Sequence, residues 1–177
     1  MADCVICQII EGRIPSKKIY EDEEVLVFLD FNGAAPGHTF VVPKEHYPIF
    51  EQVPDNIVEK LFSISNKVST ALFETLKIQG TNVFVANGVS AGQSVAHFVI
   101  NIIPRKEGDG INLEWHSRQL SEEEMSTVEL KIKEGTKNIG GVETTSTQEV
   151  TRIEGKKESI SNDEDNYLWK SVNRRIG

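Results

Sequence analysis

Apolar residues recur every three or four positions through the middle of the chain, between residues 54 and 76. This spacing places them on one side of a helix, which we expect to begin near Pro54-Asp55 and to end near Leu76. The expected buried stripe consists of Ile57, Leu61, Ile64, Val68, Leu72 and Leu76.

Four shorter segments carry the β-branched and aromatic residues that strands prefer. Residues 24–30 and 38–42 predict a hairpin, because the turn-forming residues 32–37 separate them. Residues 81–86 and 95–103 predict two further strands.

The last of these strands has two different faces. Side chains alternate along a strand, so Ala96, Phe98, Ile100 and Ile102 share one apolar face, which we expect to point into the core. His97, Val99 and Asn101 share the other face. One packed face and one chemical face are typical of a site strand in an antiparallel sheet.

The ends of the chain add smaller elements. Residues 4–11 predict a short helix ending at Gly12, residues 114–116 a short edge strand, and the capping-box pattern from Ser121 to Glu124 a helix over residues 121–133. The order of elements predicts an α+β fold with helices on an antiparallel sheet.

Changes in composition divide the chain into four parts. We expect a domain over residues 1–110, a strand and helix extension over 111–135, a polar linker over 136–162 and a C-terminal segment over 163–177. The last segment is apolar again, and we expect it to dock as a short helix on the domain or on a partner subunit.

Composition and charge exclude several classes of function. With 177 residues, 38% of them hydrophobic, the chain reads as one soluble domain plus an appendage. A net charge of -8 argues against general nucleic-acid binding. The acidic start and the lack of a long apolar run predict a cytoplasmic protein with no membrane segment.

The segment 92–105, Gly-Gln-Ser-Val-Ala-His-Phe-Val-Ile-Asn-Ile-Ile-Pro-Arg, resembles the signature of the histidine triad (HIT) family of nucleotide hydrolases and transferases. The resemblance extends over about residues 3–105. It implies a HIT-like antiparallel sheet with a long helix, and a homodimer formed by that helix and a strand joining two sheets.

The resemblance also implies that the triad is incomplete, because its three positions hold His97, Val99 and Asn101. In the family the middle histidine attacks the α-phosphate of the nucleotide. Valine has no lone pair, and the amide of asparagine does not titrate near neutral pH. We therefore expect no catalytic residue of the family's kind, with His38 as a possible substitute nucleophile or base.

The nucleotide-binding positions of the family are better kept. The residues that match them, or that replace a neighbouring family residue, are Phe28, Asp30, His38, Asn87, Gln93, Ser94 and Asn101. Asp30 matches the carboxylate that binds ribose hydroxyls, and Asn87 stands beside Ala86, where the family has a polar asparagine. An ordinary turn role for Asp30 and for His38 remains open.

Cys4 and Cys7 have the spacing that lets two thiolates bind one metal ion. The resemblance to zinc-containing HIT proteins implies His46 and His97 as the other two ligands of a structural zinc, which would staple the N-terminal helix to the sheet. Two free thiols beside unrelated histidines, and a redox disulfide, are the alternatives.

Three functions follow from these observations. The first is a purine nucleotide or nucleoside binder that has lost its nucleophile. The second is a weak nucleotide phosphoramidase or dinucleoside polyphosphate hydrolase that uses His38. The third is a zinc-stabilised protein-interaction module.

Overall fold

The computed structural model describes residues 4–137 and residue 139. The chain divides into two compact units, Met1–Asn112 and Leu113–Gly177. The first unit contains all of the strands found in the described residues and the two helices that pack on them.

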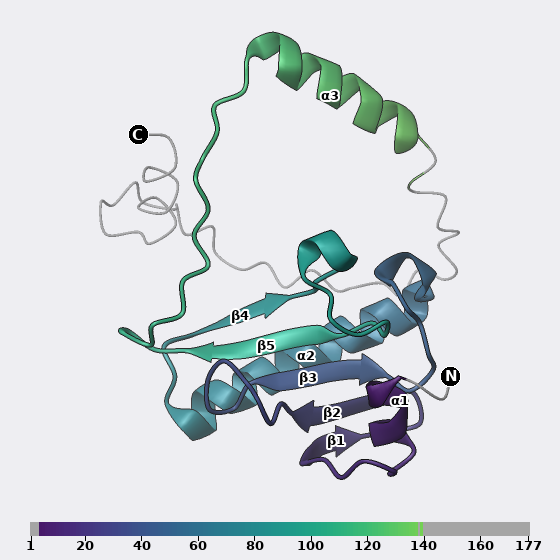
Figure 1. The fold of residues 1–177 in the computed structure, drawn as a ribbon, viewed down its shortest axis with the longest axis vertical. Helices are drawn as coiled ribbons and strands as arrows, with labels where there is room; N and C mark the ends of the chain where they lie inside the picture. Colours follow the sequence, from purple (N-terminus) through teal and green to yellow (C-terminus); the bar gives the residue numbers. More distant parts are fainter. Residues whose placement is uncertain (1–3, 138, 140–177) are drawn as a thin grey trace, which may run out of the picture. The chain divides into compact units, whose positions relative to one another are not determined.

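A five-stranded antiparallel sheet forms the first unit, with the strand order β1-β2-β3-β5-β4 (Figure 1). Its strands are β1 (Lys18–Glu21), β2 (Val25–Leu29), β3 (Thr39–Pro43), β4 (Gly80–Phe84) and β5 (Ile100–Arg105). The helices are α1 (Val5–Ile10) and α2 (Asp55–Leu76), with short 3-10 turns at Phe50–Gln52 and Val89–Ala91. This arrangement confirms the predicted α+β fold with an antiparallel sheet.

The two helices lie on opposite faces of the sheet. Val25 and Val27 of β2 belong to the apolar cluster that packs under α2, whereas Leu26 and Phe28 belong to the cluster that packs under α1. Because β2 is covered on both faces, its side chains are apolar throughout and do not alternate.

Helix α2 carries the predicted buried stripe almost complete. Ile57, Leu61, Ile64, Val68 and Leu72 are buried. Leu76 is 40% exposed, since the helix ends there and Lys77 adopts a left-handed conformation.

Three sequence predictions need correction. Residues 95–99 are not part of the strand, which begins only at Ile100, and Ala96 is exposed where a core position was expected. Residues 114–116 form no strand, and their side chains are exposed. Strand β1 was not predicted because all four of its residues are exposed, so it lacks a buried alternation.

The second unit contains α3 (Glu122–Gly135), which begins with the predicted capping box between Ser121 and Glu124. Most of the predicted linker and the whole C-terminal segment lie outside the described residues. In the described part of the chain, no helix has the length and apolar character to cross a bilayer.

Candidate functional site

A cavity of about 570 Å³ lies on the face of the sheet that carries α1. Strands β2, β3, β4 and β5, helix α1 and the loop around residues 92–95 contribute to its lining. His97, Val99 and Asn101, which were predicted to share one face, all line this cavity, while Phe98, Ile100 and Ile102 pack into the core below α2.

One side of the cavity is apolar. Ile6 and Ile9 of α1 and Phe28 of β2 line it, and Phe28 contacts Phe40 edge-on at a ring-centroid distance of 5.6 Å. Flat apolar walls of this kind suit a planar aromatic ligand.

The carboxylate of Asp30 borders the same side, at the end of β2. Its backbone N–H donates to the carbonyl of His38, and its Oδ1 accepts a hydrogen bond from the backbone of Asn32. The side chain is 21% exposed and lines the cavity, so its remaining lone pairs can accept hydrogen bonds from a ligand.

His38 lies behind the cavity lining and is 7% exposed. Its Nδ1 accepts a hydrogen bond from the backbone N–H of Ala34 at 3.1 Å, which leaves the proton on Nε2. Nε2 lies 3.3 Å from Oδ1 of Asn101 and donates to it. Both ring nitrogens are therefore occupied, and Nδ1 is also 3.5 Å from Oδ2 of Asp30.

Asn101 and Val99 occupy the floor of the cavity. Since Oδ1 of Asn101 accepts from His38, its Nδ2 amide remains as the donor that can bind a ligand. Val99 packs against the cluster under α1 and offers no polar atom to the cavity. Ser94 borders the cavity beside Gly92, whose φ of 87° is one that glycine adopts readily.

Two of the residues predicted to bind the nucleotide also make hydrogen bonds to the neighbouring loops. The amide of Gln93 accepts from the N–H of Gly88 and donates to the carbonyls of Pro48 and Val95. The amide of Asn87 accepts from the N–H of Phe50 and donates to Glu51. Gln93 still borders the cavity, whereas Asn87 is not part of its lining.

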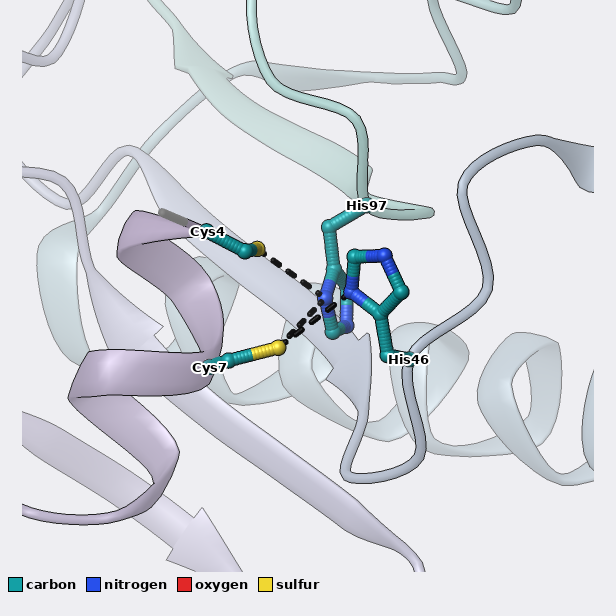
Figure 2. A group of neighbouring side chains, drawn as sticks. All are labelled: Cys4, Cys7, His46 and His97. Atoms are coloured by element: carbon teal, nitrogen blue, oxygen red, sulfur yellow. Dashed lines mark hydrogen bonds between the residues drawn. The ribbon is translucent and has the colours of Figure 1, made fainter. Parts of the chain in front are cut away.

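The side chains of Cys4, Cys7, His46 and His97 come together beside the first turn of α1 (Figure 2). Their ligand atoms all lie within 4.8 Å of one another. Cys7 Sγ is 3.2 Å from His46 Nδ1 and 3.7 Å from His97 Nδ1, and Cys4 Sγ is 3.6 Å from His97 Nδ1.

These distances fit a tetrahedral metal site. A zinc ion with Zn–S bonds of about 2.3 Å and Zn–N bonds of about 2.0 Å holds its sulfur and nitrogen ligands about 3.5 Å apart. All three sulfur–nitrogen separations, 3.2, 3.6 and 3.7 Å, lie within a few tenths of an ångström of that value. Two thiols and two imidazoles are also the donors that zinc prefers.

His97 is oriented for such a site by its second nitrogen. Its Nε2 donates to the carbonyl of Pro43 at 3.0 Å, so the lone pair of Nδ1 points at the cysteines. Burial lowers the pKa of His97, which favours the neutral, metal-binding form. Burial, together with the neighbouring Cys4, raises the pKa of the Cys7 thiol to about 11, so without a cation this thiol stays protonated at neutral pH.

The sequence did not predict that α1 forms part of the cavity wall. Its only strong signal there was the spacing of the two cysteines, which says nothing about the isoleucines between and after them. The contact becomes visible only once Ile6 and Ile9 are placed over Leu26 and Phe28 of β2.

Comparison with known proteins identifies the family. The model of the HIT domain matches residues 11–108. An uncharacterised HIT-like protein of Methanocaldococcus jannaschii is 47% identical over 107 residues, which cover 60% of this chain and 82% of that protein. The adenylylsulfatase HINT3 of Arabidopsis thaliana is 40% identical over 125 residues, covering 68% of this chain and 64% of that protein.

A solved structure has a similar fold. The zinc-bound histidine triad family protein of Mycobacterium smegmatis has a TM-score of 0.60 and 30% identity, and covers 74% of this chain and 97% of that one. The match of the HIT domain and the similarity of the fold thus show that this chain is a member of the HIT family of nucleotide-binding and nucleotide-hydrolysing proteins.

Proposed function

We propose that this protein binds a purine nucleotide in the cavity above β5 and does not perform the family's nucleotidyl transfer. The observation that carries the proposal is the floor of the cavity, where Val99 stands at the position of the attacking histidine while Asp30 and Asn101 keep polar atoms available on either side. In this proposal the groups that recognise the nucleotide are retained, and the histidine that would attack its phosphate is absent.

The nucleoside occupies the apolar side in this proposal. A purine ring lies against the apolar wall that Phe28 and the isoleucines of α1 form together, and the carboxylate of Asp30 accepts hydrogen bonds from the ribose hydroxyls. The volume of about 570 Å³ lies within the range of small-molecule sites.

The phosphate occupies the polar side. The hydroxyl of Ser94 and the Nδ2 amide of Asn101 donate to its oxygens, and Gly92 permits close approach of the backbone. These groups are neutral, so they bind a phosphate by hydrogen bonds without the charge that a protonated histidine supplies. We therefore expect modest affinity, in the micromolar to millimolar range.

The geometry argues against His38 as a substitute nucleophile. An attacking imidazole needs a free lone pair aimed at the phosphorus, but Nδ1 accepts from Ala34, Nε2 carries the proton donated to Asn101, and the ring is outside the cavity lining. Hydrolysis of adenosine phosphoramidate that is abolished by His38→Ala would overturn this part of the proposal.

Calorimetric titration with AMP, ADP and adenosine tests binding. We expect AMP to bind and Asp30→Asn to weaken it about tenfold, since a hydrogen bond to a charged group contributes about 1.5–3 kcal/mol. AMP lacking both ribose hydroxyls should bind the wild type and Asp30→Asn equally. Asp109→Asn, outside the cavity, is the matched control. If none of the three ligands binds at millimolar concentration, the proposal is wrong.

Restoring the triad tests the loss of activity. Val99→His with Asn101→His returns an imidazole to the cavity floor, and we expect adenosine phosphoramidate hydrolysis to rise by on the order of 100-fold over the wild type. Asn101→His alone is the control, because it restores no nucleophile. Equal and rapid turnover by the wild type and the double variant would show that the nucleophile was never lost.

We further propose zinc at the four clustered side chains and a homodimer as the assembly. Thiolate and imidazole donors at the measured separations support zinc. The exposed apolar residues Phe62 and Phe73 of α2 and Val83 of the edge strand β4 support the dimer. Elemental analysis of the purified protein tests for zinc, with one ion per chain expected.

A further inference from the structure

Helix α1 belongs to the metal cluster and to the nucleotide cavity at the same time. Cys7 and the N-cap residue Cys4 point at the two histidines, as Figure 2 shows. Ile6 and Ile9, one position before and two after Cys7, are buried against β2 and line the cavity. One turn of helix therefore connects the two sites.

This helix is too short to be stable by itself. It contains six residues, Cys4 provides no side-chain cap, and its first turn has no acidic residue to favour the helix dipole. Isolated helices of fewer than about 12 residues are marginal in water. Packing on β2 and attachment through the cysteines must therefore supply much of its order.

The cluster also reaches the floor of the cavity. His97 is two residues before Val99, and its Nε2 is fixed to the carbonyl of Pro43 at the end of β3. The next residue, Phe98, donates its N–H to the carbonyl of Tyr47, one residue after His46. A cation held by the four side chains would thus join α1 to the segments that precede the cavity residues of β5.

We propose that cation occupancy of the cluster controls the nucleotide affinity of the cavity, because the cation holds α1 in place as the cavity wall. Zinc is the cation whose chemistry fits the donors. The inference rests on the proposed nucleotide binding and adds its regulation. Without the cation, α1 is ordered for only a fraction of the time, and the apparent affinity falls by that fraction.

The experiment compares the full-length protein in its zinc-loaded form and after removal of zinc by a chelator followed by dialysis. AMP affinity is measured by calorimetry, and hydrogen exchange is followed at the amides of residues 5–10. We expect the metal-free protein to bind AMP at least about tenfold more weakly, with the fraction of ordered α1 reduced to about a tenth. Its α1 amides should lose protection while those of α2 keep theirs.

Three variants distinguish the effect of the cavity wall formed by α1 from the effect of the cation and from a general loss of stability. Cys7→Ser should lose zinc and bind AMP weakly. Ile9→Ala should keep one zinc per chain and still bind AMP more weakly. Leu61→Ala, in the core under α2, should be destabilised but retain both zinc and AMP affinity, since Leu61 borders neither site.

The outcomes are distinguishable. Equal AMP affinities for the zinc-loaded and metal-free proteins would overturn the inference and leave the proposed function standing. Loss of protection throughout α2 on zinc removal would also overturn it, because the cation would then support the whole fold. If the zinc-loaded protein binds no AMP, the proposed function fails and the inference fails with it.

Discussion

The positions of individual side chains decide which ligand the cavity can bind. His38 contacts several of the residues around the cavity and helps to hold them in place. It holds Asn101 through Nε2 and is itself held by Ala34. Gly33 packs directly on it, because a Cβ atom at this glycine would lie 2.6 Å from the Cβ of His38. That separation is too short for two carbon atoms.

Gly33→Ala should therefore displace His38 and loosen Asn101. We expect a loss of about 1–3 kcal/mol of unfolding free energy, typical of overpacking, together with weaker AMP binding. Urea denaturation and calorimetry measure the two effects. Gly135→Ala is the control, because nothing lies within 4 Å of a Cβ there. An unchanged AMP affinity in Gly33→Ala would mean that the position of His38 does not matter for the ligand.

At this scale the sequence predicted which residues gather but not how each is used. Asp30, Ser94 and Asn101 line the cavity, and their contact with a nucleotide stays a prediction. Asn87, however, bonds to Phe50 and Glu51, which are 37 and 36 positions away along the chain. No local pattern indicates a contact between a loop and such distant partners.

At the level of elements, the end of β5 is secured by an ion pair. Arg105 bonds through Nε and Nη2 to the carboxylate of Asp109, which also accepts from the backbone of Lys106 and Ile111. The Arg105 guanidinium, followed by the backbone N–H of Ile111, holds the pKa of Asp109 well below its usual range. The loop that Asp109 stabilises follows directly on β5, which pairs with the edge strand β4.

The depressed pKa predicts a stability that depends on pH. A carboxylate whose pKa is lower in the folded than in the unfolded protein stabilises the fold. This stabilisation is complete above the unfolded pKa of about 3.9 and disappears as the pH falls toward the folded pKa. Asp109→Asn should thus have a lower urea midpoint than the wild type at pH 7, with the difference shrinking below about pH 4. Glu129→Gln, in an exposed pair on α3, should match the wild type throughout.

Helices and strands were predicted well where their buried apolar residues recur at regular spacing, and poorly where they do not. Helix α2 shows one long apolar stripe and its limits were placed correctly. Strand β1 has no buried residue, so no burial pattern indicated it. Residues 95–99 precede β5 and do not pair with another strand, although the alternation of their side chains resembles that of a strand. A side-chain pattern reports burial, and only backbone pairing defines a strand.

For the first unit as a whole, the remaining question is what covers its exposed apolar surface. Phe62 and Phe73 are 43% and 42% exposed on α2, and Val83 is 42% exposed on β4. Ser69 lies between the two phenylalanines on α2 and bonds to Thr81 of β4, which puts the helix residues on the β4 side. Strand β4 also ends the sheet, so its outer backbone groups lack a neighbouring strand within the described chain.

A dimer that pairs two β4 edges would bury both features, and we expect the wild type to have twice the chain mass of 19.8 kDa by light scattering. Phe73→Glu with Val83→Glu should give the mass of one chain, because the added carboxylates carry the same charge and would be buried without a partner. Ile19→Lys, on the opposite edge strand β1, removes an equally exposed apolar residue and should remain dimeric. A wild type that is monomeric at tens of micromolar, or a control that dissociates equally, would show that this edge is not where two copies meet.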